Sequence, residues 1–223
     1  MYLYTGISLQ NKRPSNMDSL LATSREIDKT NAMLAVVCDG VGSLEGGGFA
    51  AGTAVRLLNE WFAALSTTTH IGLRMRDAVL DINKRIISEA ANQGIKTAST
   101  ISALLLVEDN YFSVHAGDSR IYSIQDGALE VLTSDDVSSE GKLTSYIGHT
   151  ADLFLQYAEG QALGKIFLLC SDGLYKRMDE DFMVTSLKKW GKKTLNDPLK
   201  TLPQYVIERG EKDNISFSLV KIA

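Results

Sequence analysis

The order of the predicted strands and helices constrains the fold of this chain more than any other feature. Three apolar segments near the N-terminus are typical of strands, and two long segments with helical spacing follow them. Gly94, a suitable helix C-cap, ends the second of these. The strands are expected at Tyr2–Gln10, Asp18–Ala22 and Ala32–Cys38, and the helices at Phe49–Leu65 and Leu73–Asn92.

After Gly94 the apolar period changes to that of strands. Four short strands separated by turn residues predict an antiparallel meander: Ser99–Val107, Tyr111–Ala116, Ser119–Ile124 and Leu129–Leu132. A polar irregular segment follows, Asp135–Gly148. The rest predicts two strands around a Glu159-Gly160 turn, two helices and a final strand: Leu153–Ala158, Lys165–Cys170, Asp179–Trp190, Leu195–Glu208 and Asn214–Ile222.

Strands that follow strands without intervening helices argue against a parallel sheet. We therefore expect an α+β fold of two antiparallel sheets packed together, with helix pairs outside. Such a four-layer α-β-β-α sandwich would bury every apolar stripe. No repeat, low-complexity stretch or linker interrupts the 223 residues, so one domain is expected over residues 1–223.

Charge and composition exclude several classes of protein. The net charge is 23 − 27 = −4, which argues against general nucleic-acid binding. No apolar run approaches the ~18 residues that span a bilayer. The N-terminus does not resemble a signal peptide, and two cysteines do not form a disulfide scaffold. We expect a cytoplasmic monomer that binds neither nucleic acid nor membrane.

Aspartates recur at the ends of the predicted strands. Asp39 follows one buried strand, Asp172 follows another and Asp213 precedes the last. Asp18 begins the second strand, and Asp118 follows the strand at Tyr111–Ala116. A carboxylate beside a buried strand is costly unless it is paired or binds a cation, and several together repel one another.

A hard divalent cation would cancel that repulsion, and Mg²⁺ or Mn²⁺ prefers oxygen ligands. Any single Asp-Gly pair is more simply a turn, and Asp126-Gly127 fits that interpretation. The recurrence at four or five strand ends favours a metal site.

Five motifs in order carry a resemblance to a known family. They are Arg13-x-x-Asn16-x-Asp18, Asp39-Gly40-x-Gly42, Gly117-Asp118-Ser119-Arg120, Ser171-Asp172-Gly173-Leu174 and Asp213-Asn214. Together they resemble the PP2C (PPM) family of metal-dependent protein serine/threonine phosphatases, in its bacterial type. The resemblance covers essentially the whole chain and implies the same α-β-β-α sandwich.

The resemblance implies a role for each of these residues. Asp39 would bridge two Mn²⁺ or Mg²⁺ ions, and the Gly40 carbonyl would complete the shell of one. Asp172 and Asp213 would hold the other ion, and Asp18 would ligate or orient metal-bound water. A third, weaker ion would lie between Asp118 and Asp172. Arg13 would bind the substrate phosphate through its bidentate guanidinium.

The implied reaction is hydrolysis of phosphoserine and phosphothreonine on proteins by a hydroxide that bridges two ions. Its substrates would be phosphorylated proteins, and its partners a cognate Ser/Thr kinase and the targets of that kinase. Two alternatives stay open. One is a catalytically weak regulatory or phosphoprotein-binding module, and the other is an anti-sigma-factor phosphatase.

The chain departs from the family pattern in three places. Met17 stands where the family has a glutamate that contacts one ion through a water molecule. Its absence would weaken the binding of that ion. Val41 stands where eukaryotic members have a histidine, and bacterial members also lack that histidine. The segment Asp136–Gly148 is short for the flap that bacterial members carry beside the active site.

Three other features have weaker functional interpretations. The glycine-rich loop from Gly40 to Gly48 imitates a dinucleotide-binding loop, but an aspartate precedes it and a second helix follows. His149, near the short flap, is a candidate proton donor, whereas His115 is expected in the core. Cys38 and Cys170 are expected to be small buried side chains.

Overall fold

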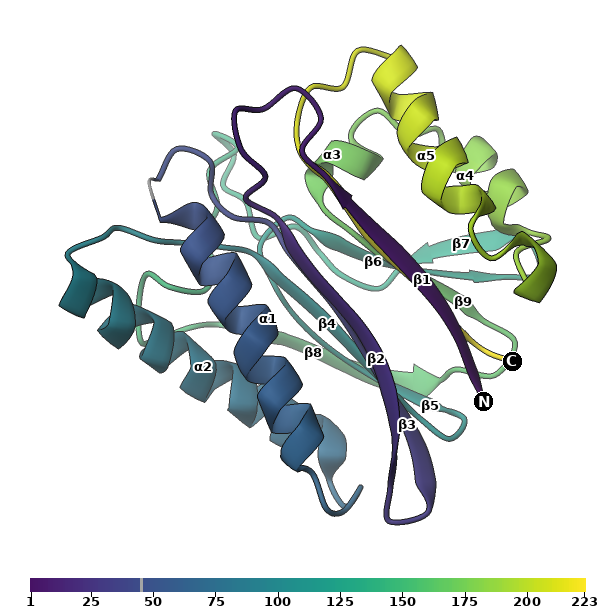
Figure 1. Cartoon of the computed structure of the whole chain (residues 1–223), viewed down its shortest axis with the longest axis horizontal. Coiled ribbons are helices and arrows are strands. Elements are labelled where there is room, and N and C mark those ends of the chain that lie inside the picture. The colour runs from purple at the N-terminus through teal and green to yellow at the C-terminus, as the bar shows by residue number, and fades with distance from the viewer. Residues whose placement is uncertain (45) are drawn as a thin grey trace.

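The computed structural model describes residues 1–44 and 46–223 and contains two five-stranded antiparallel sheets that pack face to face (Figure 1). The first sheet has the order β1-β10-β9-β6-β7, with bounds Tyr2–Leu9, Ile215–Ile222, Ile166–Cys170, Arg120–Gln125 and Ala128–Val131. The second has the order β2-β3-β4-β5-β8, with bounds Ser19–Ile27, Thr30–Cys38, Ile101–Val107, Asn110–Ala116 and Gln156–Gln161.

Helix pairs cover the outer faces of both sheets (Figure 1). The helices α1 (Gly47–Ala64) and α2 (Ile71–Gln93) pack on the second sheet and share one apolar core with it. Helices α4 (Glu180–Leu187) and α5 (Asp197–Glu208) share a second core with the first sheet. The predicted four-layer α-β-β-α sandwich is therefore confirmed.

A third core lies between the two sheets. It is built from strand side chains that point away from the helices, such as Met33 and Leu104 of one sheet and Phe167 of the other. Along β3, Leu34 and Val36 pack toward the helices while Met33 and Ala35 pack toward the other sheet. This alternation explains why the segment is continuously apolar in the sequence, since both faces of the strand are buried.

Local signals set the helix boundaries. Gly94 takes a left-handed conformation with φ of 68°, as predicted for the C-cap of α2. The Asp179 carboxylate accepts a hydrogen bond of 2.9 Å from the Phe182 N–H and so caps the N-terminus of α4.

The predicted meander after Gly94 is wrong in its pairing. Strand β4 pairs with β5, and β6 pairs with β7, but β5 and β6 belong to different sheets. The turn at Gly117-Asp118 is therefore a crossing between sheets. Gly117 has φ of +114°, and a Cβ there would lie 2.5 Å from the Thr100 side chain, so this crossing requires glycine.

Three further boundaries differ from the prediction. Strand β2 continues to Ile27 because it pairs with β3 along its whole length. The Glu159-Gly160 pair lies inside β8, opposite β5, and forms no turn. The predicted helix to Trp190 ends at Leu187, and a 3₁₀ turn, η1 (Lys192–Thr194), precedes α5. A four-residue helix, α3 (Asp172–Tyr175), was not predicted.

Candidate active site

Strand register brings the predicted aspartates to one end of the sandwich. Ser19 pairs with Cys38, which places Asp18 beside Asp39 at the end of the β2–β3 ladder. Phe217 pairs with Cys170 in the other sheet, which brings Asp213 and Asp172 to that same end. These four carboxylates thus meet because hydrogen-bonded partners fix where each strand ends, and Asp118 reaches the same end from the crossing between β5 and β6.

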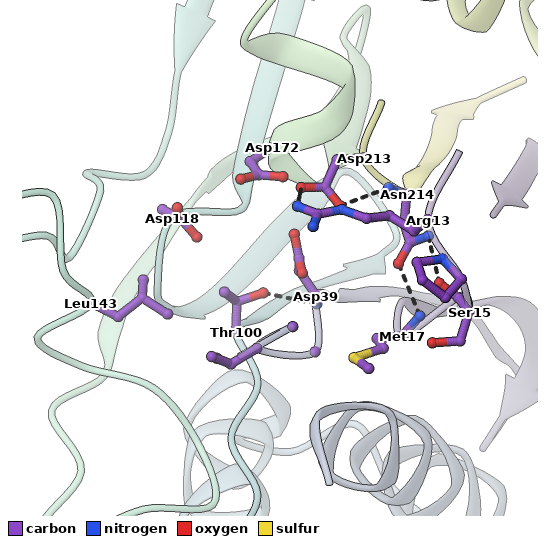
Figure 2. Close-up of a pocket in the computed structure, with 14 residues that line it drawn as sticks. Arg13, Ser15, Met17, Asp39, Thr100, Asp118, Leu143, Asp172, Asp213 and Asn214 are labelled. Carbon is purple, nitrogen blue, oxygen red and sulfur yellow. Dashed lines mark hydrogen bonds and ion pairs between the residues drawn. The ribbon is translucent and has the colours of Figure 1, made fainter. Parts of the chain in front are cut away.

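A cavity of about 390 Å³ lies at this end, between the two sheets. Figure 2 shows the side chains of Asp39, Asp118, Asp172 and Asp213 around it. The lining residues are Arg13, Pro14, Ser15, Met17, Asp39, Gly40, Val41, Gly42, Thr100, Asp118, Leu143, Asp172, Asp213 and Asn214. Nearly all the predicted site residues therefore share one pocket.

Asp39 is held by its backbone. Its N–H donates to Thr100 Oγ1 at 2.9 Å, and its carbonyl accepts from the Thr100 N–H at 2.9 Å. Thr100 Oγ1 in turn lies 2.6 Å from Ser119 Oγ. Gly40 follows in a crowded turn, where a Cβ would lie 2.6 Å from the carbonyl oxygens of Met17 and Gly47. Only glycine fits this position without a shift of the backbone.

Asp18 lies beneath the pocket and does not line it. It is 8% exposed, and its Oδ2 accepts a hydrogen bond of 2.9 Å from Ser171 Oγ. The Ser171 hydroxyl also lies 3.0 Å from the Ser216 N–H, which donates to it. Asp18 is thus placed to act on a group bound in the pocket through Asp39 or through water.

Burial and repulsion between neighbouring charges make three of the carboxylates hard to ionise. Burial raises the pKa of Asp18 to about 6, against hydrogen bonds that lower it. The pKa of Asp39 is raised well above its usual range by burial and by the charges of Asp18 and Asp172. Burial and the nearby Asp172 raise the pKa of Asp118 to about 6. Ionising these carboxylates together is therefore unfavourable unless a positive charge offsets them.

Arg13 and Asp213 form a bidentate ion pair. Arg13 Nε donates to Asp213 Oδ1 at 2.8 Å, and Nη2 donates to Oδ2 at 2.6 Å. Burial tends to raise the pKa of Asp213, but the hydrogen bonds from Arg13 and from the Asn214 N–H outweigh it and leave the pKa lowered. The predicted phosphate ligand and the predicted metal ligand therefore contact each other directly.

Three residues to which the sequence analysis gave no role also shape the site, and one of them, Asn214, belongs to a predicted motif. Asn214 ties the Arg13 loop in place, because its Nδ2 donates to the Gln10 and Ser15 carbonyls and its Oδ1 accepts from the Met17 N–H. Leu143, from the short flap segment, lines the pocket. Lys176 donates to Asp172 at 2.5 Å. Leu143 and Lys176 belong to none of the five motifs, so the sequence carried no signal for them.

The histidines and cysteines lie outside the pocket lining. His115 is buried and bonded to Ser102 Oγ and to the Gly117 carbonyl, as expected for a core residue. His149 stacks on Tyr146 and does not line the pocket, so its predicted role as proton donor has no support in this geometry. Cys38 and Cys170 are free and fully buried, and burial raises the pKa of both thiols.

Across residues 1–44 and 46–223, no three His, Cys, Asp or Glu side chains are grouped closely enough to bind a single ion. The carboxylates at the pocket are instead paired with the protein's own cations, Asp213 with Arg13 and Asp172 with Lys176. The roles predicted for the individual residues stay predictions. In the same described part of the chain, no helix combines the length and apolar character that a membrane span requires.

Comparison with known proteins agrees with the motifs and the fold. The family model for protein phosphatase 2C matches residues 9–202. The serine/threonine phosphatase stp of Listeria monocytogenes is 29% identical over 87% of this chain and 86% of its own. A crystal structure of a bacterial serine phosphatase superposes with a TM-score of 0.88 at 22% identity, over 99% of this chain and 97% of that one.

A further structure, of the catalytic domain of the phosphatase PstP in complex with two manganese ions, has a TM-score of 0.81 at 24% identity. It covers 99% of this chain and 97% of its own. The family match spans well over half of the chain. This chain therefore belongs to the protein phosphatase 2C family, and the enzyme class predicted from the motifs, a protein serine/threonine phosphatase of bacterial type, is confirmed.

Proposed function

We propose that this enzyme hydrolyses phosphoserine and phosphothreonine in proteins, with Mn²⁺ or Mg²⁺ bound at the aspartate cluster and water as the nucleophile. One observation carries the proposal. Five carboxylates meet at one end of the sandwich, burial and mutual repulsion raise the pKa of several of them, and an arginine lies at the same pocket. A phosphatase that works by cation-assisted hydrolysis needs this combination.

The donor set fits a hard divalent cation. All five side chains offer carboxylate oxygens, and the Gly40 backbone adds a carbonyl at the pocket wall. Mg²⁺ and Mn²⁺ prefer such ligands and fill their remaining positions with water, so an ion needs only a few protein groups. Asp39 and Gly40 would hold one ion, and Asp39, Asp172 and Asp213 the other, which requires these three side chains to move closer together than they lie here. When bound, the ions supply the Lewis acidity that activates water and offset the charge of the phosphate.

Arg13 would bind the substrate phosphate. Its guanidinium is 54% exposed at the mouth of the pocket, and it uses two of its five N–H groups on Asp213. The remaining donors can contact phosphate oxygens, and a planar fork suits that geometry. Because the Asn214 amide anchors the Arg13 loop at two carbonyls, the arginine is positioned before substrate arrives.

Water is the proposed nucleophile because no side chain at the site is suited to that role. Ser171 is fully buried and its hydroxyl is committed to Asp18. Both cysteines are fully buried, and burial raises the pKa of their thiols, so the reactive thiolate is disfavoured. Ser15 lines the pocket, but within residues 1–44 and 46–223 no base is hydrogen-bonded to its hydroxyl. Asp18 would orient water from below.

Phosphorylated proteins and a cognate kinase are the proposed partners, in the cytoplasm. Retention of all five aspartates favours a working enzyme over a weak regulatory module, because a binding module has no need of a costly carboxylate cluster. An anti-sigma-factor phosphatase would use the same site on a different phosphoprotein. Comparing the phosphoproteomes of a deletion strain and its parent would identify the substrate.

The experiment is turnover of p-nitrophenyl phosphate and of a phosphothreonine peptide, with the protein first stripped of metal by EDTA and then given Mn²⁺ or Mg²⁺. We expect activity to return with either metal and to be lost in Asp39→Ala and Asp172→Ala. Asp126→Asn is the matched control, since that aspartate lies in an exposed turn between β6 and β7. Full activity without metal, or in either alanine variant, would overturn the proposal.

A further inference from the structure

Lys176 places a positive charge at the edge of the aspartate cluster. It follows α3, four residues after Asp172, and one helical turn brings the two side chains together. Its ammonium donates to Asp172 Oδ2 at 2.5 Å. The Asp172 side chain is 17% exposed and that of Lys176 is 54% exposed, so the pair joins the inner pocket to its rim.

The same ammonium acts on other members of the cluster. It lowers the pKa of Asp118 against the larger effect of burial, and it interacts by charge with Asp39 and Asp213. Asp118 is further fixed by the Tyr175 hydroxyl, which donates to its backbone carbonyl at 2.8 Å. Tyr175 in turn stacks under the Arg120 guanidinium, 3.8 Å from the ring centroid. Lys176 is thus bonded to Asp172 and also acts by charge on Asp118.

We propose that Lys176 supplies the charge that a divalent ion would otherwise bring between Asp118 and Asp172, so that this pair binds no ion and the enzyme works with two. This inference rests on the proposed function. Lys176 is a positioning residue, because it acts through Asp172 and does not line the pocket. Its role would be to hold one oxygen of Asp172 outward while the other faces the pocket.

Charge arithmetic supports this assignment. The five aspartates contribute −5, and Arg13 and Lys176 contribute +2, which leaves −3. Two divalent ions would bring the site to +1, close to neutral before a phosphate arrives. A third ion would bring it to +3 and would have to displace the Lys176 hydrogen bond from the Asp172 carboxylate. The lysine therefore disfavours a third ion both by repulsion and by occupying its ligand.

The test is to count bound Mn²⁺ by isothermal calorimetry and native mass spectrometry, on EDTA-stripped full-length protein. We expect two ions in the wild type and in Lys176→Arg, which keeps the charge. Lys176→Gln should gain a third ion, bound at least about tenfold more tightly than any third ion in the wild type, because one charge is removed within a few ångströms. The double variant Lys176→Gln, Asp118→Asn should return to two. Lys84→Gln, on the surface of α2, is the control.

The outcomes separate the two proposals. Absence of Mn²⁺ binding in every variant would refute the proposed function itself. Three ions in the wild type, or two ions in Lys176→Gln, would overturn only the role of Lys176. Because Lys176 is half-exposed, its replacement should leave the fold intact, and equal thermal unfolding midpoints of the variants in EDTA would verify this. A third ion that persists in the double variant would also overturn the assignment, since Asp118 would not be its ligand.

Discussion

Replacing Asp18 by asparagine should make the metal-free protein more stable. Burial raises the pKa of Asp18 from 3.8 to about 6, and hydrogen bonds from the Ser216 and Ser171 hydroxyls only partly offset it. One pKa unit corresponds to about 1.4 kcal/mol. The ionised carboxylate therefore costs about 3 kcal/mol of folding free energy at pH 8. Asparagine carries no charge and keeps a carbonyl oxygen for the Ser171 hydroxyl.

The sign of the pH dependence follows from the same shift. The folded protein binds the Asp18 proton more tightly than the unfolded chain does, so unfolding releases a proton between about pH 4 and pH 6. The contribution of Asp18 to wild-type stability is full below this window, falls as pH rises through it and is constant above. The advantage of Asp18→Asn should be about 3 kcal/mol at pH 8 and shrink to about 1 kcal/mol at pH 4.5.

The assay is urea unfolding in EDTA at both pH values, with thermal unfolding as a second probe. For a chain of this length, the gain at pH 8 corresponds to a rise of about 6–12 °C in Tm. The control is Asp126→Asn, an exposed turn aspartate whose replacement should change stability by less than about 0.5 kcal/mol. The reasoning would be refuted if Asp18→Asn were less stable than wild type at pH 8. It would also be refuted if the difference in unfolding free energy between variant and wild type were the same at both pH values.

Three further predictions concern the geometry of the site. Arg13→Ala should lower kcat/KM for p-nitrophenyl phosphate by about 100-fold, because two charge-assisted hydrogen bonds to phosphate are lost, and Arg13→Lys should recover only part of it. Thr100→Val should cost about 1–3 kcal/mol in urea unfolding, since the Asp39 N–H loses its acceptor in a buried site. Gly173→Ala should cost at least about 3 kcal/mol in the same assay, because its Cβ would lie 2.0 Å from the Asn214 carbonyl oxygen.

Each of these has a result that would contradict it. Wild-type kcat/KM in Arg13→Ala would show that the arginine does not contact phosphate. An unchanged stability of Thr100→Val would mean that water replaces the lost acceptor. Gly42→Ala is the matched control for Gly173, since a Cβ at Gly42 meets no atom within 4 Å. Equal losses in the two glycine variants would show that the cost does not come from the clash, since the effect of alanine on the unfolded chain is stabilising.

The sequence was sufficient to predict the layers and most of the pocket lining. Asp39 and Asp172 each follow a continuously apolar strand, and an abrupt change from apolar to acidic is visible without a structure. The partner of a strand is harder to predict. Gly117-Asp118 has the composition of a hairpin turn, yet the chain crosses there from one sheet to the other. The residues that favour a hairpin turn also suit a crossing between sheets. Only the packing of the two sheets determines which of the two forms.

Residues that act through a single contact could not be predicted. Lys176 resembles any solvated helix lysine, and its function depends on α3, a four-residue helix too short to give a periodic signal. Thr100 is one of several buried hydroxyl residues near the start of β4, and only its place opposite Asp39 distinguishes it. Asp18 carries a motif signal, but its position beneath the pocket depends on the β2–β3 register.

The strands at the site also explain how repulsion among the aspartates can serve cation binding. The Asp39 N–H and carbonyl are both bonded to Thr100, and Asp18 directly precedes β2, which is paired along its whole length. The two carboxylates therefore cannot move apart without breaking backbone hydrogen bonds. Their repulsion persists in the folded protein, and a bound cation would relieve it and stabilise the fold by linkage. Added Mn²⁺ should thus raise the Tm of wild type by more than that of Asp18→Asn, because the variant has already lost part of the repulsion. An equal rise in the Tm of both proteins would show that the Asp18 carboxylate does not interact electrostatically with the bound cation.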